Sequence, residues 1–86
     1  MLTVRDYTSI NKNLIRKYKR AVRHIDEGKF QYDGTMPKVC VRPMYESKIA
    51  RLTAANEYLR GFAPEHTLTD DELYKCRAII NGASHL

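Results

Sequence analysis

Apolar side chains in the first third of the chain recur every three or four residues, which is the spacing of one face of an α-helix. The pattern predicts one amphipathic helix over Thr3 to Gly28, with Thr3 as its N-cap. Asn11 lies inside the apolar stripe, and a polar residue at such a position sets register in helical dimers. A homodimer is therefore an open alternative to packing within a bundle. The stripe consists of Val4, Tyr7, Ile10, Leu14, Ile15, Tyr18, Ala21, Val22 and Ile25.

After Gly28 the pattern changes from a helical period to alternation. Apolar and polar residues alternate over 29–32 and again over 38–42, and the segment 33–37 between them contains Asp, Gly and Pro, which favour turns. The alternation predicts a β-hairpin with a five-residue loop. Because a two-stranded hairpin is marginal alone, we expect its apolar side to pack on the helices. Its outward side then carries Lys29, Lys38 and Arg42.

Two further helices are expected in the second half of the chain. Pro43 suits the first turn of a helix that ends at Gly61. Thr69 marks the start of the last helix as its N-cap, with Glu72 as the capping-box partner, and residues 81–82 end it. The predicted fold is mainly α: a long N-terminal helix, a β-hairpin and then two helices, in one compact domain over residues 1–86 with a frayed tail at 83–86.

Length and composition limit what such a domain does. A chain of 86 residues buries only about 60 to 65% of the surface that its unfolded form exposes, which leaves little room for a large enclosed active site. The start has no signal-peptide pattern, and no apolar run approaches ~20 residues. Two cysteines are too few for a disulfide scaffold and fit a reducing compartment. The sequence therefore predicts a soluble cytoplasmic protein.

The charge pattern is the strongest functional signal. The formal net charge is +5, and residues 12–23 contain six Lys or Arg and no Asp or Glu. A solvated helix normally mixes both signs on its outer face, so this uniform sign favours an acidic partner, with nucleic acid as the first choice. The candidate contact residues are Lys12, Arg16, Lys17, Lys19, Arg20 and Arg23 on the first helix, with Lys29, Lys38 and Arg42 on the hairpin extending the patch.

Several other kinds of binding fit the sequence less well. A helix-turn-helix requires a turn of three or four residues, whereas the second and third predicted helices are separated by seven or eight. The predicted hairpin lacks the paired exposed aromatics of an RNA-recognition sheet. The apolar side of the first helix offers mainly Tyr, Ala, Ile and Val rather than the Trp, Phe and Leu of helices that bind membranes, so no membrane partner is expected.

No catalytic, metal or cofactor signature is present in the sequence. Asp70, Asp71 and Glu72 are accounted for by the first turn of a helix, where acids complement the helix dipole. The possible zinc ligands show no close pair of the C-x-x-C or H-x-x-x-H kind. These are His24, His66, His85, Cys40 and Cys76.

The sequence thus predicts a small, basic, non-enzymatic binding protein that contacts nucleic acid through the outer face of its first helix. The alternative is an inhibitor or adaptor, of the kind that viruses and mobile elements encode, which docks on a host protein or nucleoprotein complex. The two hypotheses differ in salt dependence, because binding to phosphates weakens steeply as salt rises.

Overall fold

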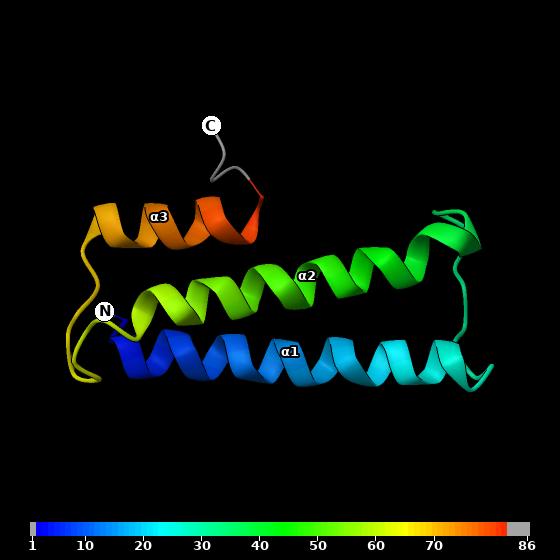
Figure 1. Ribbon diagram of the computed structural model, residues 1–86, viewed down its shortest axis with the longest axis horizontal. Coiled ribbons are helices and arrows are strands. Elements are labelled where there is room, and N and C mark those ends of the chain that lie inside the picture. Colours follow the sequence, from blue (N-terminus) through cyan, green and yellow to red (C-terminus); the bar gives the residue numbers. More distant parts are fainter. Residues whose placement is uncertain (1, 83–86) are drawn as a thin grey trace.

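Three α-helices form the regular structure of residues 2–82, the part of the chain that the computed structural model describes. Helix α1 covers Val4–Asp26, α2 covers Lys38–Leu59 and α3 covers Asp70–Ile80. Helices α1 and α2 run antiparallel along the long axis, and the shorter α3 packs against α2 at the end of the molecule where α1 begins (Figure 1). The predicted tail at 83–86 lies outside the described residues.

The helix ends agree with the caps that the sequence predicts. Thr3 is the N-cap of α1 and accepts a hydrogen bond from the backbone N–H of Asp6 at 3.2 Å, and Asp6 accepts one from the Thr3 backbone N–H in return. Thr69 and Glu72 form the corresponding capping box of α3. Gly28 follows α1 with φ of 73°, a conformation that favours glycine. Thr3, Thr69 and Glu72 are therefore confirmed in these roles, while the part of Asp6 was not predicted.

The predicted β-hairpin is wrong. Residues 38–42 form the first five residues of α2, and residues 29–37 are a loop. No strand occurs within residues 2–82. Val41 is 6% exposed and Val39 is 83% exposed. In a strand the side chains at i and i+2 would share one face, whereas in a helix they point about 200° apart, so this difference in exposure agrees with a helix that has one buried face. Packing of α2 on α1 overrode the strand preference of the two valines, because that preference is weak against burial of a whole helix face.

The start of the second helix also differs from its predicted position. Pro43 was expected in the first turn, yet α2 begins at Lys38, so Pro43 lies inside the helix. Proline has no N–H to donate to the carbonyl four residues earlier, which makes it costly at an interior position. The helix begins after Pro37, whose carbonyl accepts a hydrogen bond from Cys40 N–H at 2.9 Å.

Buried side chains gather at the end of the molecule where all three helices meet. Val4 of α1, Leu59 of α2, Leu68 and Cys76 form the central cluster. The adjoining loop is attached by backbone hydrogen bonds from Val4 N–H to His66 O and from Leu68 N–H to Leu2 O. The partly buried side chains around this cluster are Tyr7, Tyr58, Phe62 and Leu73.

Asn11 is a buried polar residue between α1 and α2. Its side chain is 2% exposed, and its amide nitrogen donates to Asn56 Oδ1 at 2.9 Å. The polar residue that the sequence placed in a possible dimer seam therefore has its partner within the same chain. Ile10, which the sequence assigned to the apolar stripe, is 48% exposed, so the buried stripe of α1 is narrower than predicted.

Candidate nucleic-acid interface

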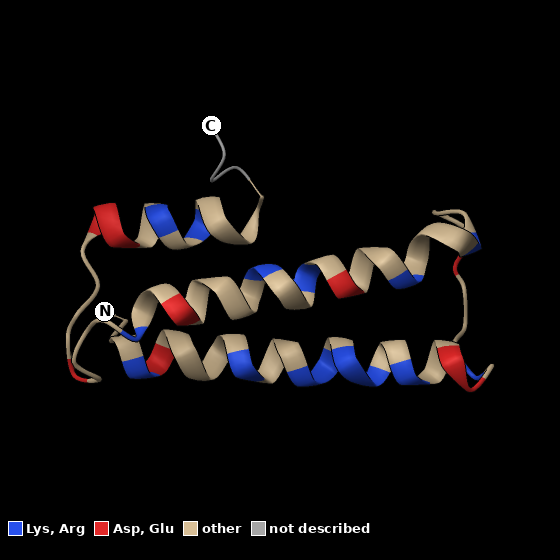
Figure 2. Cartoon of the chain, in the orientation of Figure 1, with Lys and Arg blue, Asp and Glu red and all other residues tan. Residues whose placement is uncertain are grey.

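Four cationic side chains lie together on the solvent-exposed side of α1. Arg16, Lys19, Arg20 and Arg23 have the spacing i, i+3, i+4 and i+7, which puts all four on one side of a helix. They are exposed and together line one hollow on the surface. Figure 2 shows basic positions repeating along this part of α1 without an intervening acid. We call these four residues the basic face.

The charge of the basic face is not compensated by nearby acids. Within residues 2–82, none of the four cations forms an ion pair with a carboxylate. The polar contact that the structure gives the basic face is a hydrogen bond from Arg16 Nη2 to the amide oxygen of Asn13. By contrast, Arg60, the C-cap of α2, pairs with Glu57 at 3.1 Å. The guanidinium and ammonium groups of the basic face thus keep their positive potential for an external anion.

The other two predicted cations of α1 lie beside the basic face. Lys12 is exposed about one turn before Arg16, and it lines a groove between α1 and α2 together with Lys19. Lys17 is exposed too, but consecutive residues point about 100° apart around a helix, so it lies away from Arg16. Lys12 therefore lengthens the basic face, and Lys17 belongs to a different side of α1.

Arg42 does not offer a free cation to a partner. Its Nε and Nη2 donate to the two carboxylate oxygens of Asp26 at 2.8 and 3.2 Å, and its Nη1 lies 2.8 Å from Glu46 Oε2. The hydrogen bond from Arg42 holds the pKa of Asp26 below its usual range, and Asp26 in turn raises the pKa of the guanidinium. This side chain joins the end of α1 to the start of α2.

Lys29 and Lys38 are also engaged within the chain. Lys29 Nζ lies 3.9 Å from Glu27 Oε1, and Lys38 Nζ lies over the ring of Tyr32 at 5.2 Å from its centroid. Since Lys29 is in the loop and Lys38 begins α2, the two do not continue the outer face of α1 as the hairpin would have allowed. The structure therefore brings together part of the predicted site: the four residues of the basic face, with Lys12 at one end.

The groove between α1 and α2 is a feature that sequence reasoning missed. It has a volume of about 680 Å³ and opens beside the basic face, because Lys19 lines both. The sequence gives only a weak signal for this groove. The signal is the small polar side chains of Thr8 and Ser9 on α1 and of Thr53 on α2, which leave space between the two helices. Only the pairing of the two helices brings these positions together.

The ionisable residues near α3 stabilise the fold. His66 Nε2 lies 2.9 Å from Glu72 Oε1, and its ring is stacked on Phe62 with 5.1 Å between centroids. The Thr69 backbone N–H, and after it His66, holds the pKa of Glu72 below its usual range. Burial and the nearby Glu72 carboxylate raise the pKa of the Cys76 thiol, which makes it a poor nucleophile. Cys40 and Cys76 are both free.

The described part of the chain has neither a cluster of metal-binding side chains nor a membrane-spanning helix. Residues 2–82 contain no group of three or more His, Cys, Asp or Glu side chains placed to hold a metal ion. None of the three described helices is long and apolar enough to cross a membrane. Of the candidate metal ligands, His85 lies outside the described residues.

Comparison with other proteins adds no relative. No protein-family model, curated protein or solved structure was found to match this chain.

Proposed function

We propose that this protein binds nucleic acid, without catalysis, by placing the basic face of α1 against the phosphate backbone. The observation that carries the proposal is the basic face itself, four exposed cations on one helix with no carboxylate partner within residues 2–82. With Lys12 the row extends over twelve residues, or about 16 Å of helix, which matches about five base pairs of a duplex. Positive side chains along such a length contact successive phosphates.

The composition of this surface favours a duplex over a single strand. Proteins that hold single strands stack bases on exposed aromatic rings. The aromatic residues of α1, Tyr7 and Tyr18, are half-buried, and Tyr18 packs against Tyr45 at 5.6 Å between centroids. The amide oxygen of Asn13 already accepts from Arg16, so it is not free to contact a base edge. The expected binding is therefore electrostatic and shows little dependence on base sequence.

The test is fluorescence anisotropy with labelled DNA and RNA duplexes and the matching single strands. Neutralising about four phosphates of a duplex gives a salt slope near −3.6, so duplex affinity should fall about 150-fold between ~50 and ~200 mM salt. The variant Arg16→Glu with Arg20→Glu should lower the affinity at least about tenfold and reduce the slope by about two. Tighter binding to a duplex than to its strands is also expected.

A matched control has the same net charge as the Arg16→Glu with Arg20→Glu variant. The variant Lys75→Glu with Arg77→Glu places the same change of formal charge on α3, away from the basic face. It should bind with the affinity and salt slope of the unchanged protein. Equal weakening by both variants would show attraction to net charge alone and contradict the assignment to α1. No binding at ~50 mM salt would reject nucleic acid and favour the protein-directed adaptor or inhibitor.

A further inference from the structure

The groove between α1 and α2 combines an apolar floor with a basic rim. Val4, Ile15, Leu59 and Phe62 contribute apolar atoms to its lining. Its α1 wall follows the positions 5, 8, 12, 15 and 19, and its α2 wall follows 53, 56 and 60, so each wall is one face of a helix. The α1 wall covers about four turns, from Val4 to Lys19, or about 22 Å. A groove of this length and lining is typical of sites that accept an amphipathic helix.

Some of the cations on the rim of the groove are paired with a carboxylate of the same chain, and others are not. Arg5 is paired with Glu65 at 2.8 Å, and Arg60 is paired with Glu57 at 3.1 Å. Within residues 2–82 no carboxylate pairs with Lys12 or Lys19, which are seven residues apart on the α1 wall. Two free cations about two turns apart are complementary to two acids at the same spacing on a partner.

Helix α3 of a second copy of this chain does not supply such a partner. The acids of α3 are confined to its first turn, at Asp70, Asp71 and Glu72, and Glu72 is already hydrogen-bonded within the chain. Helix α3 has 11 residues, fewer than the 16 positions from Val4 to Lys19. A nucleic-acid strand also fits poorly, because its charged backbone gains nothing from an apolar floor.

We propose that this groove binds an acidic amphipathic helix of a protein partner. Apolar side chains at i, i+3 or i+4 and i+7 of that helix lie on the floor, and acidic side chains along one edge pair with Lys12 and Lys19. The site is independent of the proposed nucleic-acid function except at two residues: Lys19 lines both surfaces, and Lys12, which lines the groove, also lengthens the basic face. Its chemistry therefore points to a partner with an exposed acidic helix.

The probe is a labelled helical peptide of about 16 residues, with leucines on one face and glutamates beside them. The unchanged protein should bind it saturably, one peptide per chain, in fluorescence anisotropy. Thr53 is exposed and lines the groove, so Thr53→Trp fills the groove without disturbing the core. We expect Thr53→Trp to weaken binding by about tenfold or more, because the indole ring occupies space on the α2 wall that the peptide would fill. Lys12→Glu should weaken it too.

The controls separate the groove from charge and from misfolding. Ala54→Trp adds the same ring at an exposed position of α2 outside the groove lining, and it should change the peptide affinity less than about twofold. Circular dichroism checks that all variants keep their helices. Equal affinity for a scrambled peptide of the same composition, no saturable binding, or unchanged binding by Thr53→Trp would overturn the proposal. Loss of duplex binding by Thr53→Trp without any peptide binding would assign the groove to nucleic acid instead.

Discussion

Among single residues, Asn11 and Asn56 make the contact that most constrains the pairing of α1 with α2. Both amides lie between the helices, and Asn11 is almost wholly removed from water. A buried amide without a partner loses its hydration and gains nothing in return, so each asparagine depends on the other. The hydrogen bond is satisfied in one relative position of the two helices, and a slip of α1 along α2 would break it.

Removing one member of this pair should therefore destabilise the fold. Asn11→Ala leaves the Asn56 carbonyl without its donor, and we expect the free energy of unfolding in urea to fall by about 1–3 kcal/mol. Ser9→Ala, an exposed position on the same helix, should change it by less than about 0.5 kcal/mol. In the double variant Asn11→Ala with Asn56→Ala, the loss should be smaller than the sum of the single losses. Additive losses would show that the two amides do not interact in solution.

Among the elements, α2 carries the clearest conflict between local preference and tertiary packing. Its first residues include two valines, and Pro43 interrupts the hydrogen bonds of its second turn. The segment remains helical because Val41 is buried, while the ring of Tyr45 packs against those of Tyr18 and Phe30. These contacts stabilise the helix start that its own residues disfavour.

Replacing Pro43 tests whether residues 38–42 are helical. Pro43→Ala restores a backbone N–H and removes a steric clash, so it should raise the free energy of unfolding by about 1–3 kcal/mol. Thermal unfolding followed by circular dichroism measures the change. The matched variant Pro64→Ala lies in the loop before α3, where no helical hydrogen bond is gained, and it should not stabilise the protein. A Pro43→Ala protein no more stable than the original would indicate that α2 begins after Pro43.

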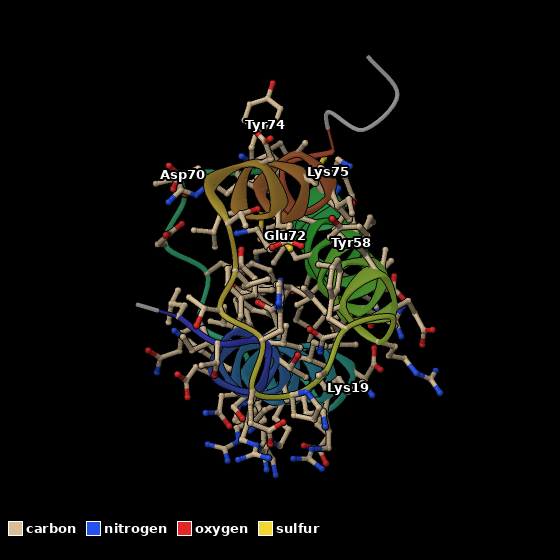
Figure 3. All side chains as sticks on the ribbon, turned by 90° about the vertical axis from the view of Figure 1, so that its left-hand side faces the viewer. Lys19, Tyr58, Asp70, Glu72, Tyr74 and Lys75 are labelled. Carbon is tan, nitrogen blue, oxygen red and sulfur yellow. The ribbon has the colours of Figure 1, made fainter. Side chains whose placement is uncertain are left out.

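At the scale of the whole molecule, two opposite sides differ in charge. The molecule measures 42 × 26 × 19 Å, and α1 forms one of its long sides. Lys19 lies on the α1 side, whereas Asp70 and Tyr74 lie at the opposite side on α3 (Figure 3). A polyanion is therefore attracted to the α1 side of the protein, and this attraction orients the two molecules before they make contact.

The basic face and the groove share Lys19, so their two proposed partners should compete. A saturating concentration of the acidic peptide should lower the affinity for a DNA duplex, and the duplex should lower the affinity for the peptide by the same factor. Anisotropy of each labelled partner with the other added unlabelled measures both factors. The scrambled peptide is the control. Unchanged duplex affinity at saturating peptide would show that the two sites are independent.

The sequence predicted the parts of the structure that depend on neighbouring residues. Thr3 and Thr69 cap their helices through contacts three residues away, and Gly28 ends α1 with its own backbone conformation, so short segments contain the necessary information. The clustering of Arg16 with Arg20 follows in the same way from the helical period. The hairpin was predicted wrongly because alternation over five residues does not distinguish a strand from a helix with one buried face.

What the sequence determined by itself is the long first helix, the start of α3 and the basic face, because each depends on hydrogen bonds or spacing within a few residues of chain. Only the tertiary structure decided that residues 38–42 are helical, that Asn11 pairs with Asn56 and that Arg42 is neutralised by Asp26. It also decided that a groove opens beside Lys19. These features depend on side chains that are far apart along the chain, so the burial and the ion pairs that produce them exist only after α1 and α2 have packed together.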